Sequence, residues 1–137
     1  MPNASTDVAA GAPTPLGYTV NDDGTVTDKV TGLMWQRAAP TDTYTWDDAM
    51  AYCPKLTLAG HDDWRVPAEI ELVSLIDDSL VPGPTIDPTA FPGTLVGYYW
   101  ADLPMAGTPD DAWLVDFNSG NAYAAGKADL LYVRCVR

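Results

Sequence analysis

Few side chains in this chain could do covalent or metal chemistry. The sole histidine is His61, in the segment Gly60-His61-Asp62-Asp63, and the two cysteines are Cys53 and Cys135. Nucleophilic catalysis needs a serine or cysteine beside a base, and a zinc site built on His and Cys needs three or four such ligands. We therefore interpret His61 as a structural or solvated turn residue, exclude zinc, and predict that the protein is not an enzyme.

Two polar segments near the C-terminus are the strongest candidates for ligand binding, because neither hydrophobic periodicity nor turn chemistry explains them. They span residues 101–111 and 118–127, and we predict that both are loops carried by a rigid sheet, where binding residues commonly lie. The second segment mixes Tyr, Ser, Gly and Asn, as adaptable recognition surfaces do, although an ordinary hairpin is the alternative. The candidate ligand-binding residues are Asp102, Leu103, Asp110, Asp111, Asn118, Asn121 and Tyr123.

The sheet that must carry these segments is predicted from alternating β-forming residues. From Tyr98 the pattern runs through residues 113–117, turns at Asn118-Ser119-Gly120, returns through residues 122–124 and ends in a last strand over residues 131–136. This order predicts an antiparallel meander. Residues 18–37 predict two or three further short strands, because Asp23-Gly24 and Thr31-Gly32 are typical hairpin turns.

Two helices are predicted between these strands. Thr45 caps the first, in which Trp46, Ala49, Met50, Cys53 and Leu56 recur at helical spacing, with a kink or an early end at Pro54. The second is expected to begin at Pro67 and to run to about Asp77. Residues 79–97 hold several prolines and glycines and predict a long loop, pinned to the core by Phe91. Together these elements predict an α+β domain.

The segment from Trp64 to Leu72 is interpreted as scaffold. Arg65 stands between Trp64 and Val66, and we expect it to pair with Glu69 or Glu71 and so to orient the second helix. The five tryptophans are interpreted first as core and second as platforms for sugar stacking.

Charge limits the partners. Seven basic against nineteen acidic residues give a formal net charge of -12, which repels nucleic acid, sulfated polysaccharides and anionic lipids. No apolar run approaches membrane-spanning length, so membrane insertion is not expected. The partners that remain are a neutral glycan, a cell-surface protein or further copies of the chain.

Residues 1–16 are rich in Ala, Pro, Thr and Gly and are predicted to form a flexible lead or linker, so the domain is expected to span residues 17–137. The first residues show neither the charged nor the apolar region of a secretory signal, and export would then depend on a signal already removed or on another route. Two cysteines by themselves are compatible with a disulfide or with two buried thiols.

Many short motifs resemble, in the same order, the Lcl C-terminal domain family, which is named for collagen-like bacterial adhesins. They include Thr31-Gly32-Leu33-Met34-Trp35, Gly60-His61-Asp62-Asp63-Trp64-Arg65-Val66-Pro67, Tyr99-Trp100, Ala112-Trp113-Leu114-Val115-Asp116-Phe117 and Val133-Arg134-Cys135-Val136-Arg137. The resemblance covers about residues 18–137. It implies a C-type-lectin-like fold and a disulfide from Cys53, in the first helix, to Cys135, in the last strand.

The resemblance also implies an extracellular, adhesin-like role, since members with assigned roles bind surface ligands, several of them sulfated glycans. The same fold class includes the variable receptor-binding proteins of diversity-generating retroelements. This chain departs from the family pattern at three points. Ala68 removes a helix cap worth about 1 kcal/mol, Ala101-Asp102 replaces small hydroxyl residues, and the acidic charge opposes sulfated ligands.

Calcium is the one metal that the sequence leaves open, because oxygen ligands are plentiful at Asp102, Asp110, Asp111, Asp116, Asn118 and Asn121. The Glu-Pro-Asn and Trp-Asn-Asp tripeptides of calcium-dependent lectin sites are absent, so we expect no cofactor. The sequence therefore predicts a non-catalytic extracellular module that binds a glycan or a protein receptor. The alternatives are an oligomerisation domain of a fibre or pilus tip, and a relative of formylglycine-generating enzymes.

Overall fold

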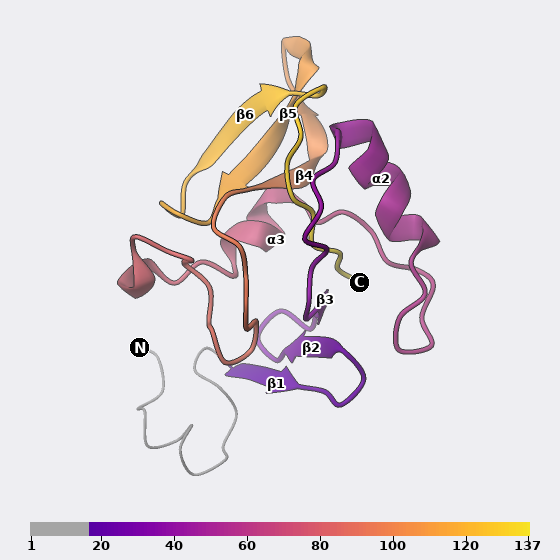
Figure 1. Ribbon diagram of the computed structural model, residues 1–137, viewed down its shortest axis with the longest axis vertical. Helices are drawn as coiled ribbons and strands as arrows, with labels where there is room; N and C mark the ends of the chain where they lie inside the picture. The colour runs from indigo at the N-terminus through magenta and orange to yellow at the C-terminus, as the bar shows by residue number, and fades with distance from the viewer. Residues whose placement is uncertain (1–16) are drawn as a thin grey trace.

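The computed structural model describes residues 17–137, and the predicted linker, residues 1–16, lies outside the described residues. The chain forms two antiparallel three-stranded sheets with short helices between them, which confirms the expected mixture of helix and sheet (Figure 1). The first sheet contains β1 (Tyr18–Val20), β2 (Thr25–Asp28) and β3 (Met34–Gln36). The second contains β4 (Tyr98–Met105), β5 (Thr108–Asp116) and β6 (Ala122–Gly126).

Helix α2 (Trp46–Lys55) forms as predicted. The Thr45 hydroxyl accepts a hydrogen bond from the Asp48 N–H at 3.3 Å, and Ala49 and Cys53 face the core. The helix ends at Lys55, one residue after Pro54, which confirms the predicted end. None of the helices described in residues 17–137 is both long enough and apolar enough to cross a membrane.

The second helix is shorter than predicted. Helix α3 spans Glu69–Val73, because Ala68 is extended (ψ 157°) and leaves Pro67 outside the helix, and because the Asp77 N–H bonds to the Thr85 carbonyl rather than continuing the helix. Ala68 provides no side-chain cap, as predicted. A 3-10 turn, η2 (Asp78–Leu80), then opens the long loop, and Phe91 anchors this loop to Tyr18 with ring centroids 5.4 Å apart.

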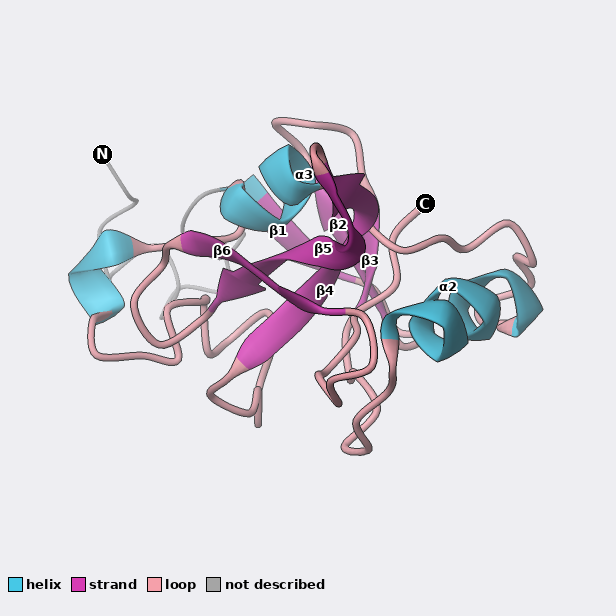
Figure 2. Cartoon of the chain, turned by 90° about the horizontal axis from the view of Figure 1, so that it is seen from above, coloured by secondary structure: helices cyan, strands magenta, loops and turns pink. Residues whose placement is uncertain are grey.

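The second sheet lies between two hydrophobic clusters, because alternate residues of β4 and β5 face opposite sides. Tyr99 and Val115 join Leu72 of α3 and Trp35 in one cluster. Trp100 and Leu114 join Cys53 of α2 and Trp64 in the other. The two helices therefore cover opposite faces of the β4–β6 sheet (Figure 2).

The C-terminal segment is not the regular last strand that we predicted. Its residues form isolated bridges with four other segments, at Tyr44, Tyr99, Arg65 and Trp35 in turn. The reason is that no single strand accompanies it: Leu131 pairs with Tyr44, Tyr132 pairs with Tyr99, and Val136 pairs with both Arg65 and Trp35.

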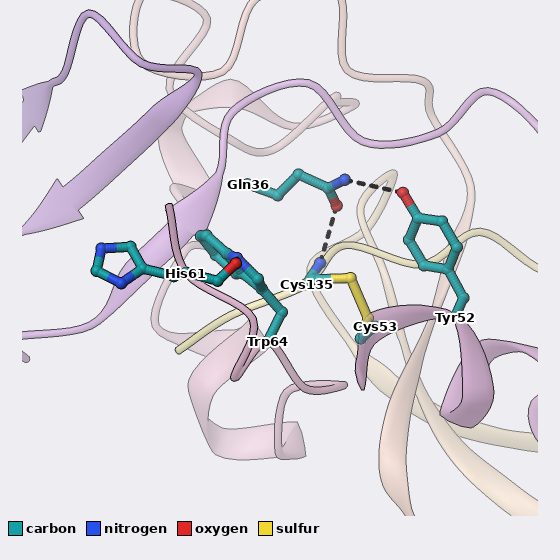
Figure 3. Close-up of a disulfide and its surroundings, with 6 residues drawn as sticks. All are labelled: Gln36, Tyr52, Cys53, His61, Trp64 and Cys135. Atoms are coloured by element: carbon teal, nitrogen blue, oxygen red, sulfur yellow. Dashed lines mark hydrogen bonds between the residues drawn. A yellow bond between two sulfur atoms is a disulfide. The ribbon is translucent and has the colours of Figure 1, made fainter. Parts of the chain in front are cut away.

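The predicted disulfide between Cys53 and Cys135 is present and joins α2 to this segment, with Cα atoms 5.6 Å apart. Gln36 locks the same junction, since its Oε1 accepts from the Cys135 N–H at 3.1 Å and its Nε2 donates to the Tyr52 hydroxyl at 3.1 Å (Figure 3). The buried Trp64 donates its indole N–H to the backbone carbonyls of Leu58 and His61. His61 thus contributes its carbonyl to a structural turn.

Candidate ligand-binding surface

The candidate binding residues lie on strands more than we predicted. Residues 101–105 and 108–111 belong to β4 and β5, which meet in a hairpin turn at Ala106-Gly107, and residues 122–126 form β6. The prediction of a loop is therefore wrong for most of residues 101–111. For residues 118–127 the structure shows the alternative, an ordinary hairpin that joins β5 to β6. The polar side chains of these segments are typical of loops, which is why loops were predicted. A strand that extends beyond the core can also be polar, because its backbone stays paired while both of its faces contact solvent.

The structure brings three candidate residues together and separates the other four. Asn118, Asn121 and Tyr123 lie at the β5–β6 turn and the start of β6. Asp102 and Leu103 occupy an irregular stretch of β4, where the pairing with β5 shifts between Trp100 and Pro104. Asp110 and Asp111 lie near the start of β5, next to Lys127 and Gly126.

The first location is an exposed patch that we call the terminal-sheet patch, formed by Tyr98, Asn118, Asn121 and Tyr123. The Tyr98 and Tyr123 rings have centroids 6.5 Å apart, and these residues are 47% and 46% exposed. The Asn121 amide donates to the Tyr123 hydroxyl at 3.4 Å. Two aromatic rings and the Asn121 amide thus meet on one surface, with the exposed Asn118 in the adjoining turn.

Buried structure holds this patch in place. The Asp116 carboxylate lies beneath the turn and accepts from the Asn118 N–H at 2.8 Å and the Ser119 hydroxyl at 3.0 Å. The buried Thr85 of the long loop donates both its N–H and its hydroxyl to the Phe117 carbonyl, at 2.8 and 2.9 Å. A Cβ on Gly120 would approach Ile76 Cγ2 to 2.9 Å, so the turn packs directly on the segment after α3.

The second location contains Asp102 beside an ion pair. The Arg65 guanidinium makes two bonds of 2.7 Å to the Glu71 carboxylate, which confirms the predicted pairing, and Glu71 also accepts from the Ala68 N–H. Hydrogen bonding to Arg65 lowers the Glu71 pKa. Asp102 differs, since its Oδ1 is buried with no hydrogen-bond partner among the described residues, and burial, reinforced by the Glu71 charge, raises its pKa.

The third location is an open depression of about 470 Å³ at the N-terminus of α2, lined by Thr45, Asp47, Asp110, Lys127 and Ala128. The Lys127 ammonium lies 4.6 Å from the centroid of the Trp46 ring. Lys127 therefore covers the aromatic surface that a sugar would need there. In the described part of the chain, no group of three or more His, Cys, Asp or Glu side chains is arranged to hold a metal ion.

Sequence reasoning missed Tyr98 as a surface residue. The run Tyr98-Tyr99-Trp100 predicts a strand, and Tyr99 and Trp100 are indeed buried. Tyr98 begins the strand, at its junction with the long loop, and its ring is left half exposed. The tryptophans follow the core interpretation, with Trp35, Trp64 and Trp100 buried and Trp46 and Trp113 partly so.

Comparison with known proteins identifies a family. None of the curated proteins compared with the chain matches it. The family model for the Lcl C-terminal domain matches residues 24–137, which include strands β2 to β6, both disulfide cysteines and the terminal-sheet patch. With most of its length matched in this way, the chain belongs to the Lcl C-terminal domain family.

Proposed function

We propose that this protein is a non-catalytic, extracellular, adhesin-like module of C-type-lectin-like fold that binds a glycan through the terminal-sheet patch. The observation that carries the proposal is the pair of half-exposed tyrosine rings with an amide beside them. Tyrosine offers a rigid apolar face and a polar hydroxyl at small cost in conformational entropy. The apolar face of a sugar ring can stack on the first, and its hydroxyls can bond to the second.

Three further features support an extracellular binding role. A disulfide is stable in oxidising compartments, and this one joins segments 82 residues apart. The patch lies on a sheet whose two faces are both packed, so ligand contact would require little reorganisation. The net charge of -12 favours a neutral glycan over a sulfated one.

A glycan array with fluorescently labelled protein tests the proposal. Replacement of both Tyr98 and Tyr123 by Ala should reduce the array signal at least about tenfold, because each stacked ring is expected to contribute about 1 kcal/mol. The control makes the same replacement by Ala at Val30 and Ile70, which lie outside the patch and are 80% and 78% exposed. It should bind like the wild type.

Two results would count against this function. A wild-type protein that binds no glycan on the array but does bind cells would point to a protein receptor. An unchanged signal from the folded double tyrosine variant would show that the patch is not the binding surface. Folding of each variant is checked by its thermal unfolding midpoint.

A further inference from the structure

A small cavity on another part of the molecule contains an unneutralised buried cation. The cavity has a volume of about 150 Å³ and lies between residues 38–41, which follow β3, and residues 92–95 of the long loop. Tyr99 and Arg134 complete its lining, and we call it the Arg134 pocket. None of the terminal-sheet patch residues lines it, so it goes beyond the proposed function.

The Arg134 guanidinium is almost completely buried, with a residue exposure of 2%, and its contacts are neutral. Its Nη1 donates to the carbonyls of Gln36 and Arg37 at 2.6 and 2.7 Å, and its Nη2 donates to the Thr94 hydroxyl at 3.0 Å. Its Cζ lies 4.8 Å from the centroid of the Phe91 ring. The ion pairs among residues 17–137 are Arg65 with Glu71 and Arg137 with Asp63, so no described carboxylate neutralises Arg134.

Such burial is unfavourable for a charge. Burial lowers the pKa of Arg134 to about 10, against an opposing effect of the Tyr99 hydroxyl, so the guanidinium remains protonated at neutral pH. Removing a cation from water without a counter-ion is unfavourable, and hydrogen bonds to carbonyls replace only a part of the lost hydration. A charged side chain that is both buried and in contact with a cavity is therefore prepared to receive an anion.

The shape and chemistry of the pocket limit that anion. A volume of about 150 Å³ holds a carboxylate with a few attached atoms and excludes an oligosaccharide chain. Arg134 is the one cation in the lining, which also contains Ala38, Ala39, Pro40 and Leu95. Arg134 can balance the single negative charge of a carboxylate, whereas a phosphate dianion would bring a second, uncompensated charge into the pocket.

We propose that the Arg134 pocket binds the carboxylate of a small organic acid or of an acidic sugar residue. The ligand's carboxylate would lie against the Arg134 guanidinium, with its carbon atoms against the alanine and proline side chains of residues 38–40. The Tyr99 hydroxyl would not donate to it, because that hydroxyl already donates to the Leu95 carbonyl at 2.8 Å. Both sources share this chemistry, and the size of the group attached to the carboxylate distinguishes them.

The test is a titration of ¹⁵N-labelled protein followed by two-dimensional NMR at constant ionic strength. Acetate represents the free acid, glucuronate the acidic sugar, and glucose the matched neutral sugar. We expect millimolar affinity, with the largest shifts in the amides of residues 93–95 and 134 and in the Arg134 Nε–H signal. Acetate and glucuronate binding alike would identify a general carboxylate pocket, and glucuronate alone would identify an acidic-sugar site.

Replacing Arg134 itself would remove three hydrogen bonds and could prevent folding. The test therefore uses a variant that fills the pocket and leaves Arg134 in place. Ala38→Phe adds a large side chain at the exposed edge of the pocket, and Ala106→Phe makes the same change at the exposed β4–β5 turn. The first should weaken carboxylate binding at least tenfold, and the second should not change it. The proposal is overturned if neither carboxylate shifts these signals, if glucose binds equally well, or if Ala38→Phe binds like the wild type.

Discussion

At the scale of single residues, two carboxyl groups near Arg65 have opposite energetic roles. Glu71 is held by two bonds of 2.7 Å to the guanidinium, and its pKa is lowered from an ordinary value of 4.5. Asp102 is partly buried with one oxygen unpaired, and its pKa is raised from an ordinary value of 3.8. A costly, poorly paired carboxylate is more typical of functional surfaces than of scaffolds.

Substitution to the neutral amides should separate these roles at pH 7. Glu71→Gln should lower the free energy of unfolding by about 1 kcal/mol, a modest value because the Arg65 side chain is 46% exposed. Asp102→Asn should raise it by at most about 1 kcal/mol, since it removes the charge of a partly buried carboxylate that has one unpaired oxygen and lies near the Glu71 charge. Urea denaturation measures both changes, and two changes of the same sign would contradict this account.

The pH dependence of each difference follows from the direction of the pKa shift. The stabilisation from Glu71 is complete above 4.5 and is lost as the pH falls through its lowered folded-state pKa. The penalty from Asp102 is complete above its raised folded-state pKa and disappears as the pH falls toward 3.8. The Asp102→Asn variant should therefore approach wild-type stability as the pH falls through 3.8, and the Glu71→Gln variant only as the pH falls below the lowered folded-state pKa of Glu71.

At the scale of elements, the two hairpin turns of the second sheet differ in what surrounds them. Gly107 and Gly120 have φ values of 83° and 82°, which other residues rarely adopt. A Cβ on Gly107 would meet nothing within 4 Å, whereas one on Gly120 would lie 2.9 Å from Ile76 Cγ2 and 3.4 Å from Asp78 Oδ1. The β5–β6 turn at Gly120 is thus held by packing against Ile76 and Asp78, whereas no neighbouring atom packs against the β4–β5 turn at Gly107.

Replacement of each glycine by alanine should reveal this difference. Gly107→Ala should cost about 1 kcal/mol, the backbone term alone. Gly120→Ala should cost clearly more and should also weaken glycan binding, because the terminal-sheet patch is built on this turn. Thermal unfolding and the glycan array measure the two effects. Equal costs for the two variants would show that the contact with Ile76 does not hold the turn.

Sequence patterns predicted the elements best where a local cause sets each boundary. The Thr45 cap and Pro54 delimited α2, and the Asp-Gly and Thr-Gly turns delimited the first sheet. The patterns failed where a contact outside the element sets its end. The helical region after α3 ends early, for example, because the Asp77 N–H bonds to the Thr85 carbonyl. The C-terminal segment failed for the same reason, because its four neighbours are all far away in the sequence.

The candidate site was predictable only in part. Turn composition identified Asn118, Asn121 and Tyr123, which the structure does bring together. No local pattern shows that the Tyr98 ring lies against Tyr123 across the sheet, or that Asp102 and Asp110 lie in separate places. The Arg134 pocket was also invisible in the sequence, because residues 36–37, 92–95 and 134 meet only after folding.

At the scale of the whole molecule, the disulfide is the one covalent cross-link, and it joins helix α2 to the C-terminal segment. It joins residues 82 apart, for which the chain-entropy model gives a stabilisation of about 4.5 kcal/mol. The bridge lies within the cluster of Trp64, Trp100 and Leu114, where both cysteines are fully buried. Its loss would therefore affect the packing on one whole face of the second sheet.

Replacement of both Cys53 and Cys135 by alanine should lower the free energy of unfolding by about 4 kcal/mol. The same loss should follow when the wild type is unfolded in the presence of a reducing agent, and the double variant should no longer respond to that agent. Urea denaturation with and without reductant makes the comparison. Equal stability of the oxidised and reduced wild type would mean that the bridge does not support the fold.

The most direct test of the central claim, that ligand is bound on the terminal-sheet patch, is an NMR map of the bound surface. ¹⁵N-labelled protein is titrated with the neutral glycan that gives the strongest array signal, and every backbone amide is followed. The account predicts that the largest shifts fall at residues 97–99 and 118–124, with little change around Asp110 or in α2. Shifts centred on the depression beside Lys127, or spread evenly over the molecule, would contradict it.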